Sequence, residues 1–271
     1  MVVRLEWAGG RPGTEDVLVY AESDTEAFYG RFDRARTFTT RAVQSAKNAD
    51  MADTDAGWKA NAALREVEVG NRVQARAIAT EALQLSRGRD VEPQIALALA
   101  RAGQSAQAEK LVAKLNTDHP RNTTVQSYWL PTIRAAIELQ NKNASKAIEL
   151  LEETRRYELG EGLQGRMYPV YLRGEAYLMS GYGDQAAGEF QKILDHRGVV
   201  LNFVIGSLAR LRLARAAAMS GDTASARKHY EEFLELWKGA DTDLPVLSAA
   251  RTEYKRRSGH LPLLDWSRSR E

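Results

Sequence analysis

Three glycines give the chain the spacing of a phosphate-binding loop, because Gly160, Gly162 and Gly165 fit the pattern G-x-G-x-x-G. Such a loop cradles a phosphate when it follows a strand and opens a helix. Here the residues from Ala144 to Thr154 have the pattern of a helix, and those from Arg155 to Tyr157 do not form a strand. We therefore interpret the glycines as part of a loop between two helices and expect no cofactor.

The titratable side chains are not spaced as a catalytic or metal-binding set. The chain has no cysteine, which excludes disulfides, thiolate metal sites and cysteine nucleophiles. No two histidines lie four residues apart, as a helical zinc site needs. The pair Asp195–His196 has no nucleophile placed beside it by the sequence, and adjacent carboxylates such as Glu152 and Glu153 diverge by about 100° around a helix. We expect no catalytic residue and no metal.

The composition indicates that helices must position any site. Ala occurs 40 times and Leu 29 times among the 271 residues, and both are strong helix formers. All seven prolines stand beside breaks in the pattern, and the residues that favour strands are sparse. We expect an all-α protein rather than a sandwich, a barrel or a doubly wound sheet.

Charge and hydropathy limit the partners. The 38 basic and 36 acidic residues give a net charge of +2, with the signs mixed along the chain, unlike the basic stripe of a nucleic-acid-binding protein. Apolar runs are only a few residues long, so no segment has the length of a membrane span or the apolar region of a secretory signal. We expect a soluble segment with no nucleic-acid partner and no insertion into a membrane.

A repeat of about 40 residues runs through the chain. A turn residue is followed five positions later by an alanine, and the spacings between these alanines are 40, 33, 39, 39 and 40 residues. The pairs are Gly30 and Ala35, Gly70 and Ala75, Gly103 and Ala108, Lys142 and Ala147, Gly181 and Ala186, and Gly221 and Ala226.

Each unit is predicted to be a helical hairpin. Glycine adopts the left-handed conformation that closes a helix at little cost, and alanine lets the second helix approach the first closely. One hairpin cannot bury its apolar seam alone, so neighbours must stack on it. The first helices are expected at 14–29, 56–69, 91–102, 123–140, 166–180 and 202–219, the second helices at 32–48, 72–86, 105–118, 144–154, 184–195 and 223–237, and a capping helix at 244–257.

The fifth unit carries a resemblance to the tetratricopeptide repeat (TPR). Gly174 and Tyr177 match its G-x2-Y element, and Ala186 and Phe190 match A-x3-F. Val170 and Arg173 stand where the TPR pattern has Trp and Leu, and most units are longer than its period of about 34 residues. The resemblance covers residues 14–238 and implies a TPR-like α-solenoid of about six helix-turn-helix repeats.

Several segments resemble the C-terminal TPR region of bacterial eukaryote-like serine/threonine protein kinases, and related regions occur in bacterial winged-helix regulators. The segments are residues 8–16, 128–137, 157–160, 195–198 and 233–241. This resemblance implies a sensory or scaffolding region tethered to a signalling domain. The chain has no H-R-D catalytic loop and no D-F-G motif, so we do not expect it to be an enzyme. We expect residues 1–13 to be the remnant of a preceding repeat, 14–257 the repeat domain and 258–271 an irregular tail.

In TPR arrays the first helices line a concave face where partner peptides dock, and the resemblance implies such a face here. Aromatic and arginine side chains on it are the types enriched at binding hot spots. The Lys/Asn carboxylate clamp of chaperone-binding TPR proteins is not present at these positions. The predicted partner-binding residues are Trp129 and Thr132 in the fourth unit, Tyr168, Tyr171 and Glu175 in the fifth, and Leu208, Arg212 and Arg215 in the sixth.

Three hypotheses of function follow. The first is a non-catalytic scaffold that binds a protein or peptide, as the regulatory region of a bacterial kinase. The second is the effector domain of a transcriptional regulator, with a small ligand between its helices or a protein partner. The third is a helical enzyme, for which the sequence nominates no titratable pair. Association of two copies stays open. The chain would be periplasmic if tethered beyond the membrane span of a kinase, and cytoplasmic otherwise.

Overall fold

The computed structural model describes residues 15–86, 88–160 and 167–257. The segment 1–13, the tail 258–271, His260 and the last two glycines of the G-x-G-x-x-G run lie outside these residues. Within the described parts of the chain every regular element is a helix and no strand is present, so the all-α prediction is confirmed.

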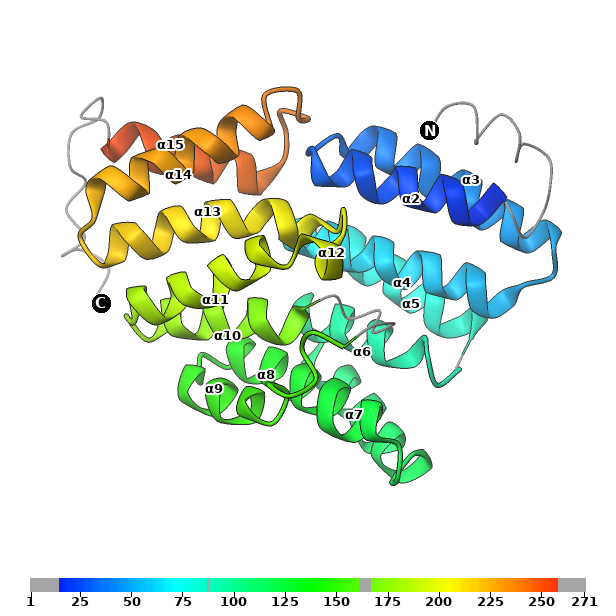
Figure 1. The fold of residues 1–271 in the computed structure, drawn as a ribbon. Coiled ribbons are helices and arrows are strands. Elements are labelled where there is room, and N and C mark those ends of the chain that lie inside the picture. The colour runs from blue at the N-terminus through cyan, green and yellow to red at the C-terminus, as the bar shows by residue number, and fades with distance from the viewer. Residues whose placement is uncertain (1–14, 87, 161–166, 258–271) are drawn as a thin grey trace.

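The helices form six successive antiparallel pairs that stack into a solenoid (Figure 1), as predicted. The first helices of the pairs are α2 (Glu15–Phe28), α4 (Ala52–Glu68), α6 (Glu92–Arg101), η1 with α8 (Val125–Trp129, Leu130–Gln140), α10 (Tyr168–Met179) and α13 (Val204–Met219). The second helices are α3 (Phe32–Asn48), α5 (Arg72–Leu85), α7 (Ser105–Asp118), α9 (Ala144–Glu152), α11 (Gly183–Asp195) and α14 (Thr223–Leu236). The short α12 (Arg197–Val200) precedes α13, and α15 (Pro245–Arg257) packs on α14.

The turns within the pairs share one geometry. All five predicted turn glycines have positive φ, between 76° and 101°, and Lys142 holds the equivalent place with φ 62°. In each turn the next backbone N–H donates to the carbonyl five residues earlier, at 2.8–2.9 Å, which is the 6→1 bond of a Schellman C-cap. The six repeat alanines are at most 2% exposed. The predicted turn and the predicted close contact are therefore confirmed in every unit.

Two of the predicted helices differ from the structure by more than two residues or in helix type, for identifiable reasons. Helix α4 begins at Ala52 rather than 56, because Asp50 takes a left-handed conformation (φ 54°) and completes a very short turn after α3; aspartate tolerates that region better than most residues. The predicted helix 123–140 contains a π-helical turn, Val125–Trp129. It lies just before Pro131, whose ring would clash with a regular α-helical turn and which lacks an N–H.

The end of the array contacts the first two repeats. The segment between α14 and α15 lies on their turns: Trp237 Nε1 donates to the Phe28 carbonyl at 3.0 Å, and Asp241 N donates to the Gly30 carbonyl at 3.1 Å. Val246 N donates to the Val69 carbonyl at 3.2 Å. Helix α13 also packs against α2 and α4. The array is thus wound tightly enough that its two ends meet.

Candidate functional site

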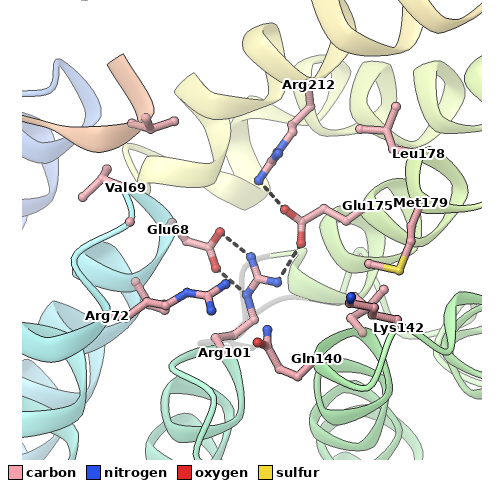
Figure 2. Close-up of a pocket in the computed structure, with 14 residues that line it drawn as sticks. Glu68, Val69, Arg72, Arg101, Gln140, Lys142, Glu175, Leu178, Met179 and Arg212 are labelled. Carbon is pink, nitrogen blue, oxygen red and sulfur yellow. Dashed lines mark hydrogen bonds and ion pairs between the residues drawn. The ribbon is translucent and has the colours of Figure 1, made fainter. Parts of the chain in front are cut away.

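A pocket of about 580 Å³ lies near the C-terminal ends of helices α4, α6, α8 and α10 (Figure 2). We call it the central pocket. Its walls come from five successive repeats, the second to the sixth, and from the start of α15, so residues more than 170 positions apart in the chain share it. The lining residues are Val67, Glu68, Val69, Gly70, Arg72, Arg101, Leu139, Gln140, Lys142, Glu175, Leu178, Met179, Arg212 and Val246.

The repeat register explains how four of these side chains come together. Glu68, Arg101, Gln140 and Met179 each lie two residues before the left-handed turn residue of their unit. Equivalent positions in stacked repeats project from equivalent places on neighbouring hairpins. The sequence predictions did not include Glu68, Arg101, Gln140 or Met179, although their shared position before the turn residue is visible in the sequence.

Arg101 is the centre of an ionic network in the pocket. Its Nε and Nη2 donate to the two carboxylate oxygens of Glu68 at 2.8 and 2.7 Å, and its Nη1 donates to Glu175 at 2.7 Å. Glu175 also accepts a hydrogen bond from Arg212 (Figure 2). A guanidinium fork that meets a carboxylate on both oxygens is among the strongest polar contacts in proteins. The network joins α4, α6, α10 and α13.

Opposite charges keep Glu175 and Arg101 ionised at neutral pH despite their burial. Burial alone would raise the pKa of Glu175, but the guanidinium groups of Arg101 and Arg212 outweigh it and hold that pKa below its ordinary value. Burial would lower the pKa of Arg101, yet Glu175 and Glu68 raise it well above the ordinary value. Glu175 is therefore not placed as a general acid, which needs a pKa near the working pH.

Two further cations lie at the edge of the pocket. Arg72 and Lys142 are exposed, line the pocket, and have no carboxylate partner among the residues that the structure describes. Figure 2 shows them on two sides of the network. Four cations thus face two carboxylates in the pocket. The lining carries an excess of positive charge that an anion would neutralise.

The structure divides the eight predicted partner-binding residues into three groups. Glu175 and Arg212 lie in the central pocket, while Arg215 forms a two-bond ion pair with Glu253 of α15 at 2.8 and 2.9 Å. The other five side chains are at most 5% exposed and would reach a partner only if repeats separated; they are Trp129, Thr132, Tyr168, Tyr171 and Leu208.

Two of the buried residues support the network from behind. The Tyr168 hydroxyl donates to Glu68 at 3.4 Å, and the Tyr171 hydroxyl accepts from Arg212 Nε at 3.1 Å. Burial is the main cause that raises the pKa of both tyrosines, so both hydroxyls stay protonated at neutral pH.

The other sequence candidates are placed apart from this pocket. Asp195 and His196 do not pair: Asp195 accepts from Gln191 at 2.8 Å, and His196 Nδ1 lies 2.8 Å from the Lys192 carbonyl. Within the described residues no group of three or more His, Asp or Glu side chains is arranged to hold a metal ion. Nor does any helix in that part of the chain combine the length and apolar character that crossing a membrane requires.

Comparison with known proteins adds no relative: no protein-family model matches the chain, and no curated protein is significantly similar to it in sequence. The chain therefore has an all-α, solenoid-like fold of stacked helical pairs, with a pocket lined by four cations and two carboxylates.

Proposed function

We propose that this chain is a non-catalytic binding domain that takes an acidic segment of a protein or peptide partner in the central pocket. The observation that carries the proposal is the pair of cations, Arg72 and Lys142, beside a network whose carboxylates are already paired with arginines. A volume of about 580 Å³ lies within the usual range of ligand sites and accommodates a few side chains.

The backbone at Lys142 supports a role for its ammonium group. Glycine holds the equivalent turn position in the other five units, and Lys142 alone places a side chain there, with φ 62°. The left-handed conformation costs a residue with a Cβ roughly 1–2 kcal/mol. Strain of this size commonly marks functional positions, and here the strained residue lines the pocket.

The proposal that the chain is a TPR-like regulatory region is based on the resemblances in the sequence. Six equivalent left-handed turns and six buried alanines support a TPR-like repeat. The segments that resemble kinase-linked TPR regions support placing the chain as the regulatory region of a bacterial serine/threonine kinase, on the same side of the membrane as that region.

A second function is favoured by the closed winding of the array. Because the α14–α15 segment contacts the first two repeats, the inner face offers a bounded pocket rather than a long groove. A bounded pocket suits a small dicarboxylate or phosphate, as in the effector domain of a transcriptional regulator. The two functions differ in the size of the anion that binds.

Fluorescence polarisation with a labelled peptide of alternating Glu and Ser tests the proposal, with the Gln/Ser peptide as the uncharged comparison. The double variant Arg72→Gln/Lys142→Gln is compared with Arg251→Gln/Lys255→Gln, which removes the same charge from exposed positions on α15. We expect the pocket variant to bind the acidic peptide about three- to tenfold more weakly, since each exposed ion pair contributes up to about 1 kcal/mol. The α15 variant should stay within about twofold of the parent.

Equal binding of the acidic and uncharged peptides, or equal loss in the two double variants, would overturn the proposal. Titration with succinate separates the two functions. Full displacement of the peptide by succinate at comparable occupancy favours the small-ligand function, and no displacement favours the peptide function.

A further inference from the structure

A second cavity, of about 600 Å³, lies between the first repeat and the α12–α13 connection, away from the central pocket. We call it the α12 pocket. It is lined by aromatic, aliphatic and polar side chains, and none of them belongs to the central pocket. Its lining residues are Tyr20, Ala21, Asp24, Thr25, Phe28, Tyr29, Ile193, Leu194, Arg197, Val200, Leu201, Asn202, Gly206, Arg210 and Leu236.

Two arginines in this pocket carry charge that nearby carboxylates do not neutralise. Arg197 and Arg210 form no ion pair within the described residues, and Arg210 is held by Nη1 donating to the Gly206 carbonyl at 3.2 Å. Burial and the positive charge of Arg197 lower the pKa of Arg210. An anion bound against both guanidinium groups would offset the effect of burial and of Arg197 on Arg210.

The acidic groups near these arginines are already engaged. Asp24 lines the pocket, but its Oδ1 accepts from Asn61 at 2.8 Å and from Arg65 at 2.9 Å. Glu232 raises the pKa of Arg210 by less than Arg197 lowers it. The carboxylate of Glu232 lies 3.0 Å from Nδ1 of His229. The positive charge of the two arginines therefore stays available to a ligand.

Much of the remaining lining of the pocket is aromatic or aliphatic. Tyr20 stacks on Trp58 with ring centroids 3.8 Å apart, and Phe28 meets Tyr29 edge to face at 5.4 Å. Leu201 adds an exposed aliphatic side chain. Such a wall favours a flat or aliphatic body, because its burial contributes roughly 25 cal/mol per Å².

We propose that the α12 pocket binds a small organic anion, with its apolar body on Tyr20 and Phe28 and its phosphate or carboxylate group on Arg197 and Arg210. The ligand would touch α2 in the first repeat and α13 in the last. It would thus hold together the two ends of the array, and binding stabilises the state that binds.

Calorimetric titration of the full chain with phenyl phosphate tests this inference. Phenylacetate distinguishes carboxylate from phosphate, inorganic phosphate lacks the apolar body, and benzyl alcohol lacks the charge. We expect phenyl phosphate or phenylacetate to bind at least tenfold more tightly than inorganic phosphate and benzyl alcohol. We also expect Arg210→Gln to weaken that binding at least tenfold, and Ala21→Leu to weaken it by filling the opening.

Arg251→Gln on α15 is the matched control and should bind like the parent. The thermal midpoint without ligand separates loss of binding from loss of folding: Arg210→Gln removes an unneutralised charge and should keep or raise the midpoint. Binding that survives Arg210→Gln, or equal binding of inorganic phosphate or benzyl alcohol, would overturn the inference. The central-pocket variant Arg72→Gln/Lys142→Gln should still bind phenyl phosphate, so the two sites can fail separately.

Discussion

Two arginine–glutamate clusters in this molecule share their chemistry and differ in their surroundings. One centres on Arg173 of α10, whose side chain has no exposed surface. Its Nε and Nη2 donate to Glu189 at 2.8 and 2.7 Å, Nη2 also donates to Glu158 at 2.6 Å, and Nη1 donates to the Leu151 carbonyl at 2.9 Å. Lys192 adds a second contact to Glu158 at 2.7 Å. Arg173 and Glu158 have no exposed surface, and solvent reaches only outer members such as Lys192, which is 29% exposed; we call this the sealed cluster.

The cluster around Arg101 uses the same guanidinium fork but borders an open pocket. Its arginine is 11% exposed, and two further cations stand beside it without a carboxylate partner among the described residues. A sealed cluster can act only on folding, because nothing reaches it. An open cluster with surplus charge acts on folding and also on whatever anion enters. From this difference we expect the surroundings of an ion pair, rather than its geometry, to set its role.

The largest effect is expected from breaking the sealed cluster. Arg173→Ala leaves the buried carboxylates of Glu158 and Glu189 with less compensation, so we expect a loss of about 3–5 kcal/mol in the free energy of unfolding. Urea unfolding followed by circular dichroism measures it. Arg227→Ala on the exposed face of α14 is the control and should cost no more than about 0.5 kcal/mol. A similar small loss in both variants would show that the sealed cluster is not structural.

Breaking the open cluster should cost less. In Arg101→Ala, Glu175 keeps Arg212 as a partner, and the pocket admits water to Glu68. We expect a loss of about 2 kcal/mol in the free energy of unfolding, measured in the same urea experiment, with Arg251→Ala as the control. A loss equal to or larger than that of Arg173→Ala would contradict the distinction between sealed and open clusters.

The pH dependence of stability should report on Glu175. Its pKa in the folded chain is lowered, mainly because Arg101 and Arg212 outweigh burial, so its ionised form contributes stability above the unfolded pKa of about 4.3. That contribution is lost as the pH falls through the lower folded pKa. The difference in unfolding free energy between the parent and Glu175→Gln should therefore be constant from pH 7 to 5 and shrink below about pH 4. If the difference in unfolding free energy stays constant down to pH 3, the ionised form of Glu175 does not stabilise the folded chain as assigned.

The smallest effect on stability is expected from the unpaired cations. Arg72→Gln and Lys142→Gln should each change the unfolding free energy by less than about 0.5 kcal/mol, although we expect them to weaken binding of the acidic peptide. A loss above about 1 kcal/mol in either variant would mean that the side chain has a structural partner and is not free for a ligand.

Much of the fold was predictable because its causes are local. A left-handed turn residue and a tightly packed alanine five positions later recur in every unit, and both requirements can be met only by a few residue types. Even the departure at Val125–Trp129 has a local cause in Pro131. Part of the candidate site could have been predicted in the same way, because Glu68, Arg101 and Gln140 occupy the same position in their repeats.

By itself, the sequence determined the helices, their pairing and the absence of any cysteine chemistry, because propensity, turn geometry and composition act over a few residues. The tertiary structure alone decided how tightly the pairs wind. Winding depends on the sum of small rotations between repeats, and the contacts that close it join residues far apart, such as Trp237 with Phe28. The packing of the repeats on one another buried five of the eight predicted binding residues, brought Arg101 against Glu175, and left the two pockets where the repeats do not fill the space between them.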